Sequence, residues 1–263
     1  MKARKRFGQH FLTDQAVLGR ITAACHIGEN DTVFEIGPGH GALTEHIVTS
    51  GPKKYVAVEI DRDLVPLLSA QFPQVEIVNQ DILRVDLDQF TREYGRDLKV
   101  VGNLPYNIST PLLLKLAHWS RSSTGGMRDG VFMVQRELGE RLAATPGSKS
   151  WGRLSVMTQL AFEIEYLFDV PPESFSPPPK VWSSIVRLIP SQQWAHLTSE
   201  ELDAVDRVCR FSFSGRRKKL SNSLKALDID WSQEKVDPKV RADDVTIQEF
   251  VSLARYVTNE SSK

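Results

Sequence analysis

An amide, a proline and an aromatic ring stand together in the segment Asn103-Leu-Pro-Tyr106. The preceding Val100 and Val101 indicate the end of a buried strand, and Ser109 and Pro111 indicate the start of a helix. We therefore expect the segment at the carboxyl edge of a sheet, where open α/β sheets bind ligands. The alternative is a simple turn between strand and helix, because Asn and Pro are common in turns.

These groups suit a flat base that carries an exocyclic amine. The lone pair of such an amine is conjugated into the ring, so two acceptors on its hydrogens would make the nitrogen a better nucleophile. Asn103 Oδ1 and the carbonyl of Leu104 or Pro105 are the candidate acceptors, and Tyr106 would stack on the ring. The predicted chemistry is catalysis by orientation of the amine toward an electrophile.

A glycine-rich loop, Gly37-Pro-Gly-His-Gly41, lies between a strand predicted over residues 32–36 and a helix predicted over 42–50. Such glycines let the backbone approach a ligand closely, although a tight turn would also use them. The third glycine follows the second by two residues rather than by the three of a nicotinamide-binding loop, and Glu35 lies in the strand. This pattern favours S-adenosylmethionine, which has no pyrophosphate.

Two further acids follow predicted strands. Glu59 ends a strand over residues 54–60, about 20 residues after the glycine loop, where an acid can bind both ribose hydroxyls. Asp81 follows a strand over 75–79 and is a candidate acceptor for the cofactor's adenine amine. Either acid alone could instead be a helix cap or a loop charge. Asp61 is predicted to cap a helix that bends or starts late, because Pro66 cannot lie in its middle.

Composition limits the class of protein. The 263 residues suffice for one large and one small domain, and the net charge is zero, so any affinity for nucleic acid must come from local patches. The two cysteines, Cys25 and Cys209, have no metal-binding spacing and indicate reduced thiols in the cytoplasm. No apolar run reaches the length of a membrane span. The basic arm at residues 2–6 is either a solvated tail or a phosphate contact.

Several motifs together resemble one family, and they occur along nearly the whole chain. They are Phe7-Gly-Gln-His-Phe-Leu12, Glu35-Ile-Gly-Pro-Gly-His-Gly-Ala-Leu-Thr44, Glu59-Ile-Asp61, Gln80-Asp81, Asn103-Leu-Pro-Tyr-Asn-Ile-Ser-Thr110, Gly152-Arg-Leu-Ser-Val156, the block from Val170 to Ser183 and the block from Phe213 to Leu224. The chain resembles the bacterial small-subunit (16S) rRNA adenine N6,N6-dimethyltransferase family.

The resemblance implies roles for particular residues. S-adenosylmethionine would be bound by residues at His10, Leu12, Gly37, Glu59, Asp81 and Asn103. The target adenine would meet Asn103, Leu104, Pro105 and Tyr106, and Phe175 would stack on the flipped base from the other side. The family often has Asn where His10 stands. The alternative for Phe175 is an ordinary core phenylalanine.

The expected fold is α/β: a Rossmann-like, seven-strand, S-adenosylmethionine-dependent methyltransferase fold with a small C-terminal all-helical domain. Further strands over residues 131–135, 166–170 and 184–189 complete the sheet. A change of composition near residue 190 places the boundary, giving domains 1–190 and 191–263. The second domain is predicted to contain helices over 200–213, 217–227 and 247–257.

The second domain also carries a basic cluster. Seven Lys or Arg residues and no acid lie between Arg207 and Lys225, including the run Arg216-Arg-Lys-Lys219. The cluster is either the solvated start of a helix or a site that binds RNA phosphates.

The predicted reaction is dimethylation of the N6 amine of two adjacent adenosines in a terminal loop of small-subunit rRNA. S-adenosylmethionine is the methyl donor, and no metal is expected. The expected partner is the rRNA of an immature 30S subunit, with a role in late assembly, and the protein is expected to be a cytoplasmic monomer. The alternatives are a large-subunit rRNA dimethyltransferase of the antibiotic-resistance type and a non-catalytic assembly factor that binds RNA.

Overall fold

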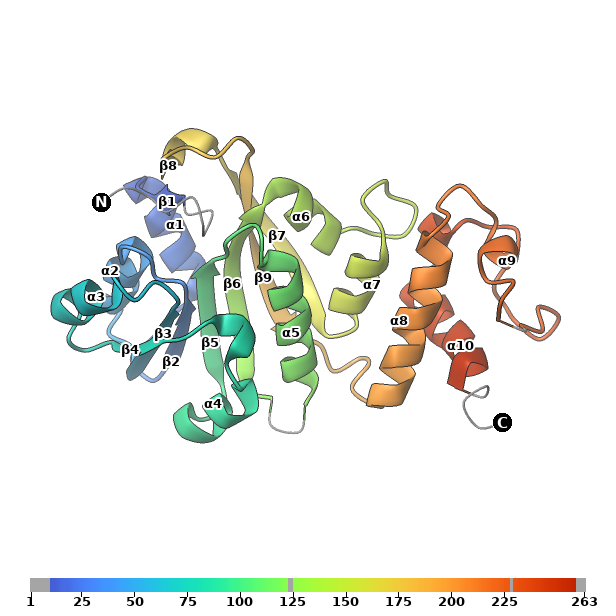
Figure 1. Ribbon diagram of the computed structural model, residues 1–263, viewed down its shortest axis with the longest axis horizontal. Helices are drawn as coiled ribbons and strands as arrows, with labels where there is room; N and C mark the ends of the chain where they lie inside the picture. Colours follow the sequence, from blue (N-terminus) through green and yellow to red (C-terminus); the bar gives the residue numbers. More distant parts are fainter. Residues whose placement is uncertain (1–9, 123–124, 228, 259–263) are drawn as a thin grey trace. The chain divides into compact units, whose positions relative to one another are not determined.

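Seven strands form one mixed sheet in the order β4-β3-β2-β5-β6-β9-β7 (Figure 1). The computed structural model describes residues 10–122, 125–227 and 229–258. The strands are β2 (Thr32–Ile36), β3 (Lys54–Glu59), β4 (Glu76–Asn79), β5 (Leu98–Asn103), β6 (Met127–Gln135), β7 (Phe162–Val170) and β9 (Ser183–Pro190). The first five strands in this order, from β4 to β6, run parallel, whereas β9 is antiparallel to both β6 and β7. The predicted seven-strand fold is confirmed.

Helices cover both faces of this sheet. They are α1 (Gln15–Cys25), α2 (Ala42–Val48), α3 (Val65–Gln71), α4 (Leu87–Tyr94) and α5 (Ser109–Arg121). Alternate residues of β2 point to opposite faces: Val33 joins a buried cluster with Leu18 of α1 and Ile47 of α2, while the ring of Phe34 lies 4.2 Å from that of Phe90 in α4. Apolar side chains on both faces explain why the central strands are continuous hydrophobic runs.

Helix α3 begins late, as Pro66 predicts, with the proline in its first turn. The predicted cap is wrong, because the residue before the helix is Leu64, which makes no side-chain cap. Asp61 instead closes the preceding turn: its carboxylate accepts from the Asp63 N–H and its carbonyl from the Leu64 N–H. The acid therefore organises the turn and not the helix itself.

A second, two-stranded sheet joins distant parts of the chain. Strand β1 (Phe11–Leu12) pairs antiparallel with β8 (Phe175–Ser176). Residues 10–12 take part in this pairing, and residues 7–9 and the basic arm at 2–6 lie outside the described residues.

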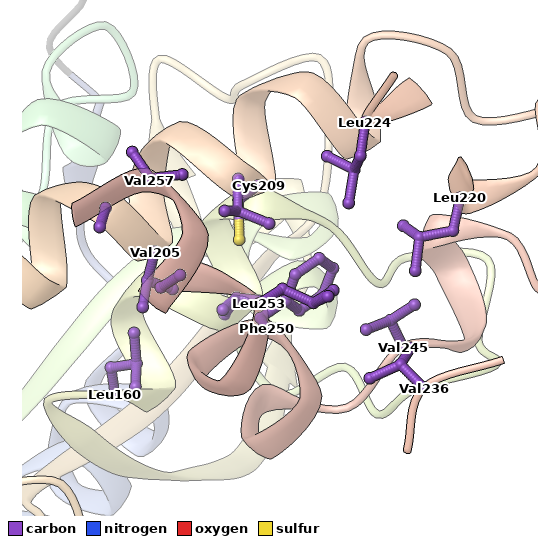
Figure 2. Packing of buried hydrophobic residues seen from close by; sticks show 14 of the residues in the cluster. Leu160, Val205, Cys209, Leu220, Leu224, Val236, Val245, Phe250, Leu253 and Val257 are labelled. Carbon is purple, nitrogen blue, oxygen red and sulfur yellow. The ribbon is translucent and has the colours of Figure 1, made fainter. Parts of the chain in front are cut away.

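The chain divides into two compact units: Met1–Gly139 with Phe162–Pro190, and Glu140–Ala161 with Ser191–Lys263. The elements of the second unit are the end of α6 (Arg136–Leu142), α7 (Arg153–Gln159), α8 (Ser199–Phe213), α9 (Leu220–Ser223) and α10 (Ile247–Thr258). Their apolar side chains pack together, as Figure 2 shows for Val205, Leu253 and Phe250. No helix of the described residues is long and apolar enough to cross a membrane.

The predicted boundary near residue 190 coincides with the boundary between the two units at Pro190 and Ser191. Residues 140–161, however, belong to the second unit. The prediction gave them to the first domain. In the structure, Trp151, Val156 and Leu160 belong to the same buried cluster as α8 and α10, and Trp151 Nε1 donates to the Val245 carbonyl at 3.0 Å. The segment joins the second unit because its apolar side chains are buried there.

The helix predicted over residues 217–227 is wrong. Only Leu220–Ser223 is helical. Lys219 has extended backbone and forms a bridge with Arg241, and the Leu220 N–H donates to the Val240 carbonyl. Pairing with this distant segment replaces the first turns of the expected helix.

Two glycines with positive φ, one before α2 and one after it, supply a test of the fold. Gly41 has φ +82°, and a Cβ there would lie 2.4 Å from Phe72 Cε2. Gly51 has φ +63° with no atom within 4 Å of such a Cβ. We expect Gly51→Ala to lower the free energy of unfolding by about 1 kcal/mol through backbone strain, and Gly41→Ala to lower it by roughly 1–3 kcal/mol more through overpacking. Urea denaturation measures both, and equal losses would contradict the account.

Candidate active site

A pocket of about 260 Å³ lies at the carboxyl edge of the parallel strands. It forms where the chain order reverses: β3 lies on one side of β2 and β5 on the other, which is where α/β sheets bind ligands. Every residue that lines it belongs to the first unit. Its lining includes all the residues predicted to bind the cofactor: His10, Leu12, Gly37, Glu59, Asp81 and Asn103.

The glycine loop and Glu59 form one wall of the pocket. Glu59 is 3% exposed, and its carboxylate accepts from the Gly39 N–H at 3.1 Å and the Asp61 N–H at 2.8 Å. Burial raises the pKa of Glu59, while these two N–H groups counteract the rise. Each carboxylate oxygen keeps a further lone pair, so the group can still accept from hydroxyls in the pocket.

Asp81 lies at the edge of the pocket after β4. Its carboxylate accepts from the Leu83 N–H at 3.0 Å and caps a short 3₁₀ turn, Ile82–Arg84. Asp81 can therefore both cap this turn and bind a ligand. The cap uses one carboxylate oxygen, and the side chain also lines the pocket.

The amide of Asn103 is held in a fixed orientation at the end of β5. Its Nδ2 donates to the His10 carbonyl at 3.1 Å. Among the described residues Oδ1 has no hydrogen-bond partner, and Asn103 lines the pocket. The first acceptor that the sequence predicted is thus present and unengaged.

The second predicted acceptor is less accessible than expected. The Pro105 carbonyl already accepts from the Ile108 N–H at 3.0 Å and from Ser109 Oγ at 2.9 Å, which begins α5. The Leu104 carbonyl has one long contact with Ser109 Oγ at 3.4 Å, but Leu104 is 0% exposed. Since a carbonyl oxygen has two lone pairs, Pro105 has none to spare and only Leu104 retains acceptor capacity.

Tyr106 lines the pocket. Two contacts restrain its side chain, one at the hydroxyl and one at the ring. Its hydroxyl hydrogen-bonds Ser183 Oγ at 2.8 Å. Its ring lies 5.9 Å from the ring of His10 at an interplanar angle of 29°. Burial raises the pKa of the phenol, so it stays protonated at neutral pH. The ring is a rigid aromatic surface on the pocket wall.

His10 and its neighbours are tied to the β8 loop. His10 Nδ1 bonds the Pro177 carbonyl at 2.9 Å, and the Ser174 carbonyl accepts from the Thr13 N–H at 2.9 Å. The Phe11 ring lies 4.2 Å from that of His40 in the glycine loop. His10 therefore serves the pocket through its carbonyl and ring position, and its imidazole nitrogen is used for anchoring.

The structure does not bring Phe175 to the pocket. Its ring is 4% exposed and belongs to the buried cluster with Leu12 and Val17, because the pairing of β1 with β8 sets Phe175 opposite Leu12. The expected second face for a flipped base is thus not formed by this residue here. The prediction is corrected to a core phenylalanine that anchors β1.

Glu35 lines the pocket and is buried, with 1% of its surface exposed. Thr44 Oγ1 and the Tyr55 hydroxyl each donate to its Oε2 at 2.7 Å. Burial raises the pKa of Glu35 to about 7, against the effect of these donors. The sequence indicates Glu35 but not its partners Thr44 and Tyr55, because no local pattern joins residues so far apart. For the same reason it does not indicate the contact of Ser183 with Tyr106.

The described residues contain no group of three or more His, Cys, Asp or Glu side chains arranged to hold a metal ion. The expectation that the reaction needs no metal stays a prediction.

Comparison with known proteins decides the family. A model described as ribosomal RNA adenine dimethylase matches residues 1–259. The chain is 43% identical over 260 residues to ribosomal RNA small subunit methyltransferase A of Dechloromonas aromatica, covering 97% of this chain and 98% of that protein. It is 45% identical over 260 residues to the Pseudomonas aeruginosa protein of the same name, covering 96% and 94%.

The chain belongs to the ribosomal RNA adenine dimethylase family. This membership confirms the expected class of enzyme, an rRNA adenine dimethyltransferase that depends on S-adenosylmethionine.

Solved structures agree with the fold. A dimethyladenosine transferase from Plasmodium falciparum superposes with a TM-score of 0.76 at 25% identity, covering 93% of this chain and 96% of that one. The 23S rRNA methyltransferase ErmE superposes with a TM-score of 0.69 at 24% identity, covering 94% and 98%. The fold alone therefore does not distinguish a dimethyladenosine transferase from a 23S rRNA methyltransferase.

The corrected position of Phe175 predicts a separation of stability from activity. Phe175→Leu should lower the free energy of unfolding by about 1 kcal/mol, as a conservative core replacement, and leave methylation near the wild-type rate. Phe175→Ala should cost about 3–5 kcal/mol through the cavity it leaves. Denaturation and methyl-transfer assays well below the unfolding temperature test this. A methylation defect in Phe175→Leu at near-native stability would instead favour contact with the base.

Glu35 predicts a specific pH dependence. Its carboxyl titrates near 4.5 when unfolded and near 7 when folded, so the folded protein holds a proton that the unfolded chain has lost between these values. This contribution to stability is fully present below pH 4.5 and is lost as the pH rises through 7. Between pH 4.5 and 7.5, the free energy of unfolding should fall more in the wild type than in Glu35→Gln, by roughly 1–3 kcal/mol.

Urea denaturation across this pH range measures the difference. The matched control is Glu45→Gln on α2, whose side chain is exposed and whose pH profile should parallel the wild type. Parallel profiles for Glu35→Gln as well would contradict the assigned state of the buried acid.

Proposed function

We propose that this chain dimethylates the N6 amines of two adjacent adenosines in a terminal loop of small-subunit (16S) rRNA. The observation that carries the proposal is the pocket itself, in which an unengaged Asn103 Oδ1 and the Tyr106 ring share a cavity with the glycine loop and Glu59. The identity of 43–45% to small-subunit methyltransferases A over nearly the full chain supports this choice of substrate.

The residues of the pocket fit the methyl donor. Glu59 keeps acceptor capacity for the ribose hydroxyls, and Asp81 is available to the adenine amine. The glycine loop allows close approach of the backbone, and His10, Leu12 and Asn103 complete the binding set. S-adenosylmethionine supplies a methyl group on a positively charged sulfur. The neutral amide of Asn103 and the acids of the pocket stabilise that positive charge better than an apolar wall would.

The reaction requires an adenine nitrogen aimed at that methyl group. Asn103 Oδ1 accepts one amine hydrogen, and the Leu104 carbonyl accepts the other once the segment opens for the base. Tyr106 stacks on one face of the ring and holds its plane. The amine becomes acidic after it has bonded the methyl group, so solvent can remove the proton and no strong base is needed. Orientation supplies most of the rate.

The second unit offers contacts to the RNA backbone. Of its basic cluster, Arg210 is paired with Asp206 and Arg216 with Asp243. Arg217, Lys218 and Lys219 are exposed and form no ion pair with another described residue. Unpaired cations of this kind bind phosphates with an affinity that falls as salt rises. We assign these three residues to the rRNA of an immature 30S subunit, bound in the cytoplasm by a monomer of this protein.

The direct test incubates purified protein with unmethylated 30S subunits, 50S subunits and a radiolabelled methyl donor, followed by nucleoside analysis. We expect N6,N6-dimethyladenosine in 16S rRNA only. Label in 23S rRNA would favour the antibiotic-resistance type of enzyme. Binding to immature subunits without methyl transfer or donor binding would favour a non-catalytic assembly factor.

The residues of the base site predict a split between donor binding and chemistry. Asn103→Ala removes the acceptor, and Tyr106→Ala removes the stacking surface, so each should lower methylation by about 10²-fold or more. Calorimetry of Tyr106→Ala should show donor affinity within about ten-fold of wild type, since Glu59 and the glycine loop remain. Asn103→Ala should weaken donor binding as well, because it also removes the bond to the His10 carbonyl. The exposed Asn107→Ala in the same segment is the control and should be fully active. Full activity in either test variant would remove the catalytic assignment.

A further inference from the structure

The loop from Ser174 to Ser183 contacts two walls of the pocket, the His10 segment and Tyr106, yet none of its residues lines the cavity. At its beginning, the Ser174 carbonyl accepts from Thr13, and β8 pairs with β1. At its end, Ser183 meets the hydroxyl of Tyr106. One connection therefore holds the His10 segment and the base-binding ring at the same time.

Ser183 is well placed to fix the ring. It is 0% exposed, as the first residue of β9, and its backbone is held in register opposite Gln135 at the end of β6. Among the described residues, Tyr106 is the hydrogen-bond partner of its Oγ. A buried hydroxyl on a paired strand is a rigid anchor, since neither its backbone nor its side chain has alternative partners in water.

The position of the contact on the ring explains its effect. Tyr106 follows Pro105 in the short connection between β5 and α5, so the backbone alone leaves the ring free to rotate about its side-chain bonds. The Ser183 bond acts on the phenol oxygen, the atom farthest from the backbone, where a small force gives the greatest control of ring direction. The ring plane decides how a stacked adenine lies, and a misplacement of about 1 Å can cost 10²-fold in rate.

We propose that Ser183 is a positioning residue for methyl transfer, which sets the plane of the Tyr106 ring through the 2.8 Å hydrogen bond between their hydroxyls. Ser183 itself touches neither base nor methyl donor. The inference rests on the proposed function, because it assigns the ring the task of holding the target adenine.

The test is a double-mutant cycle of Ser183→Ala and Tyr106→Phe, each of which removes one side of the same bond. We expect each single variant to lower kcat for small-subunit rRNA about ten-fold, with KM for the methyl donor unchanged within two-fold. The double variant should be no slower than either single variant, because the bond can be lost only once. Ser183→Thr, which keeps the hydroxyl, should restore most of kcat.

Ser184→Ala is the matched control, since Ser184 is the next residue, is also 0% exposed and does not line the pocket. Its kcat should equal that of the wild type. Denaturation midpoints and donor binding confirm that each variant is folded. Unchanged kcat in Ser183→Ala, or effects of the two single variants that multiply in the double variant, would overturn the proposal.

A readout without turnover separates this inference from the proposed function. In protein with ¹³C-labelled tyrosine rings, the Tyr106 signal is the one that disappears in Tyr106→Phe. It should shift or broaden in Ser183→Ala and not in Ser184→Ala, and an unchanged signal would overturn the ring-positioning contact. If the wild type transfers no methyl group to rRNA, the proposed function fails while the signal still reports whether Ser183 holds the ring.

Discussion

The hydrogen bond from Asn103 Nδ2 to the His10 carbonyl is the constraint on which the pocket depends. It joins the end of β5 to a segment 93 residues earlier in the chain. Because the amide nitrogen is used in this bond, its oxygen is the atom left for a ligand. One contact thus closes the wall of the cavity and decides that the wall presents an acceptor.

This bond can form only if the His10 segment is itself held in place. The strand pairing of β1 with β8 and the contact of His10 Nδ1 with Pro177 hold it from one side. The Phe11 ring packs on the glycine loop from the other, 3.2 Å from where a Cβ of Gly39 would lie. The pocket therefore depends on backbone pairing between segments far apart in sequence. Buried acids complete it, with Glu35 and Glu59 each satisfied by two donors.

Much of the fold could be predicted from the sequence because it rests on local patterns. Continuous apolar runs predict the central strands, and acids placed directly after them reach one edge of the sheet whatever the details of packing. This is why Glu59, Asp81 and Asn103 were found together in advance. The resemblance to a known family supplied His10 and Leu12, which no spacing argument would have selected.

The errors have a common physical cause in contacts between distant segments. Phe175 is buried because β8 pairs with β1. The residues next to Phe175 in the sequence do not show whether its ring is buried. Residues 140–161 join the second unit because Trp151 is buried among α8 and α10. The region after Arg217 loses its helix to pairing with residues 238–241. The Pro105 carbonyl is occupied by Ile108 and Ser109 at the start of α5. The sequence indicates this helix start but not that it uses the carbonyl.

The measurement that tests the central claim most directly is a crystal structure of the protein with adenosine joined through N6 to an analogue of the methyl donor. The account predicts N6 within hydrogen-bond distance of Asn103 Oδ1, the base stacked on Tyr106 and the donor's ribose on Glu59. A base bound elsewhere, or an Asn103 amide that presents its nitrogen to the ligand, would contradict it.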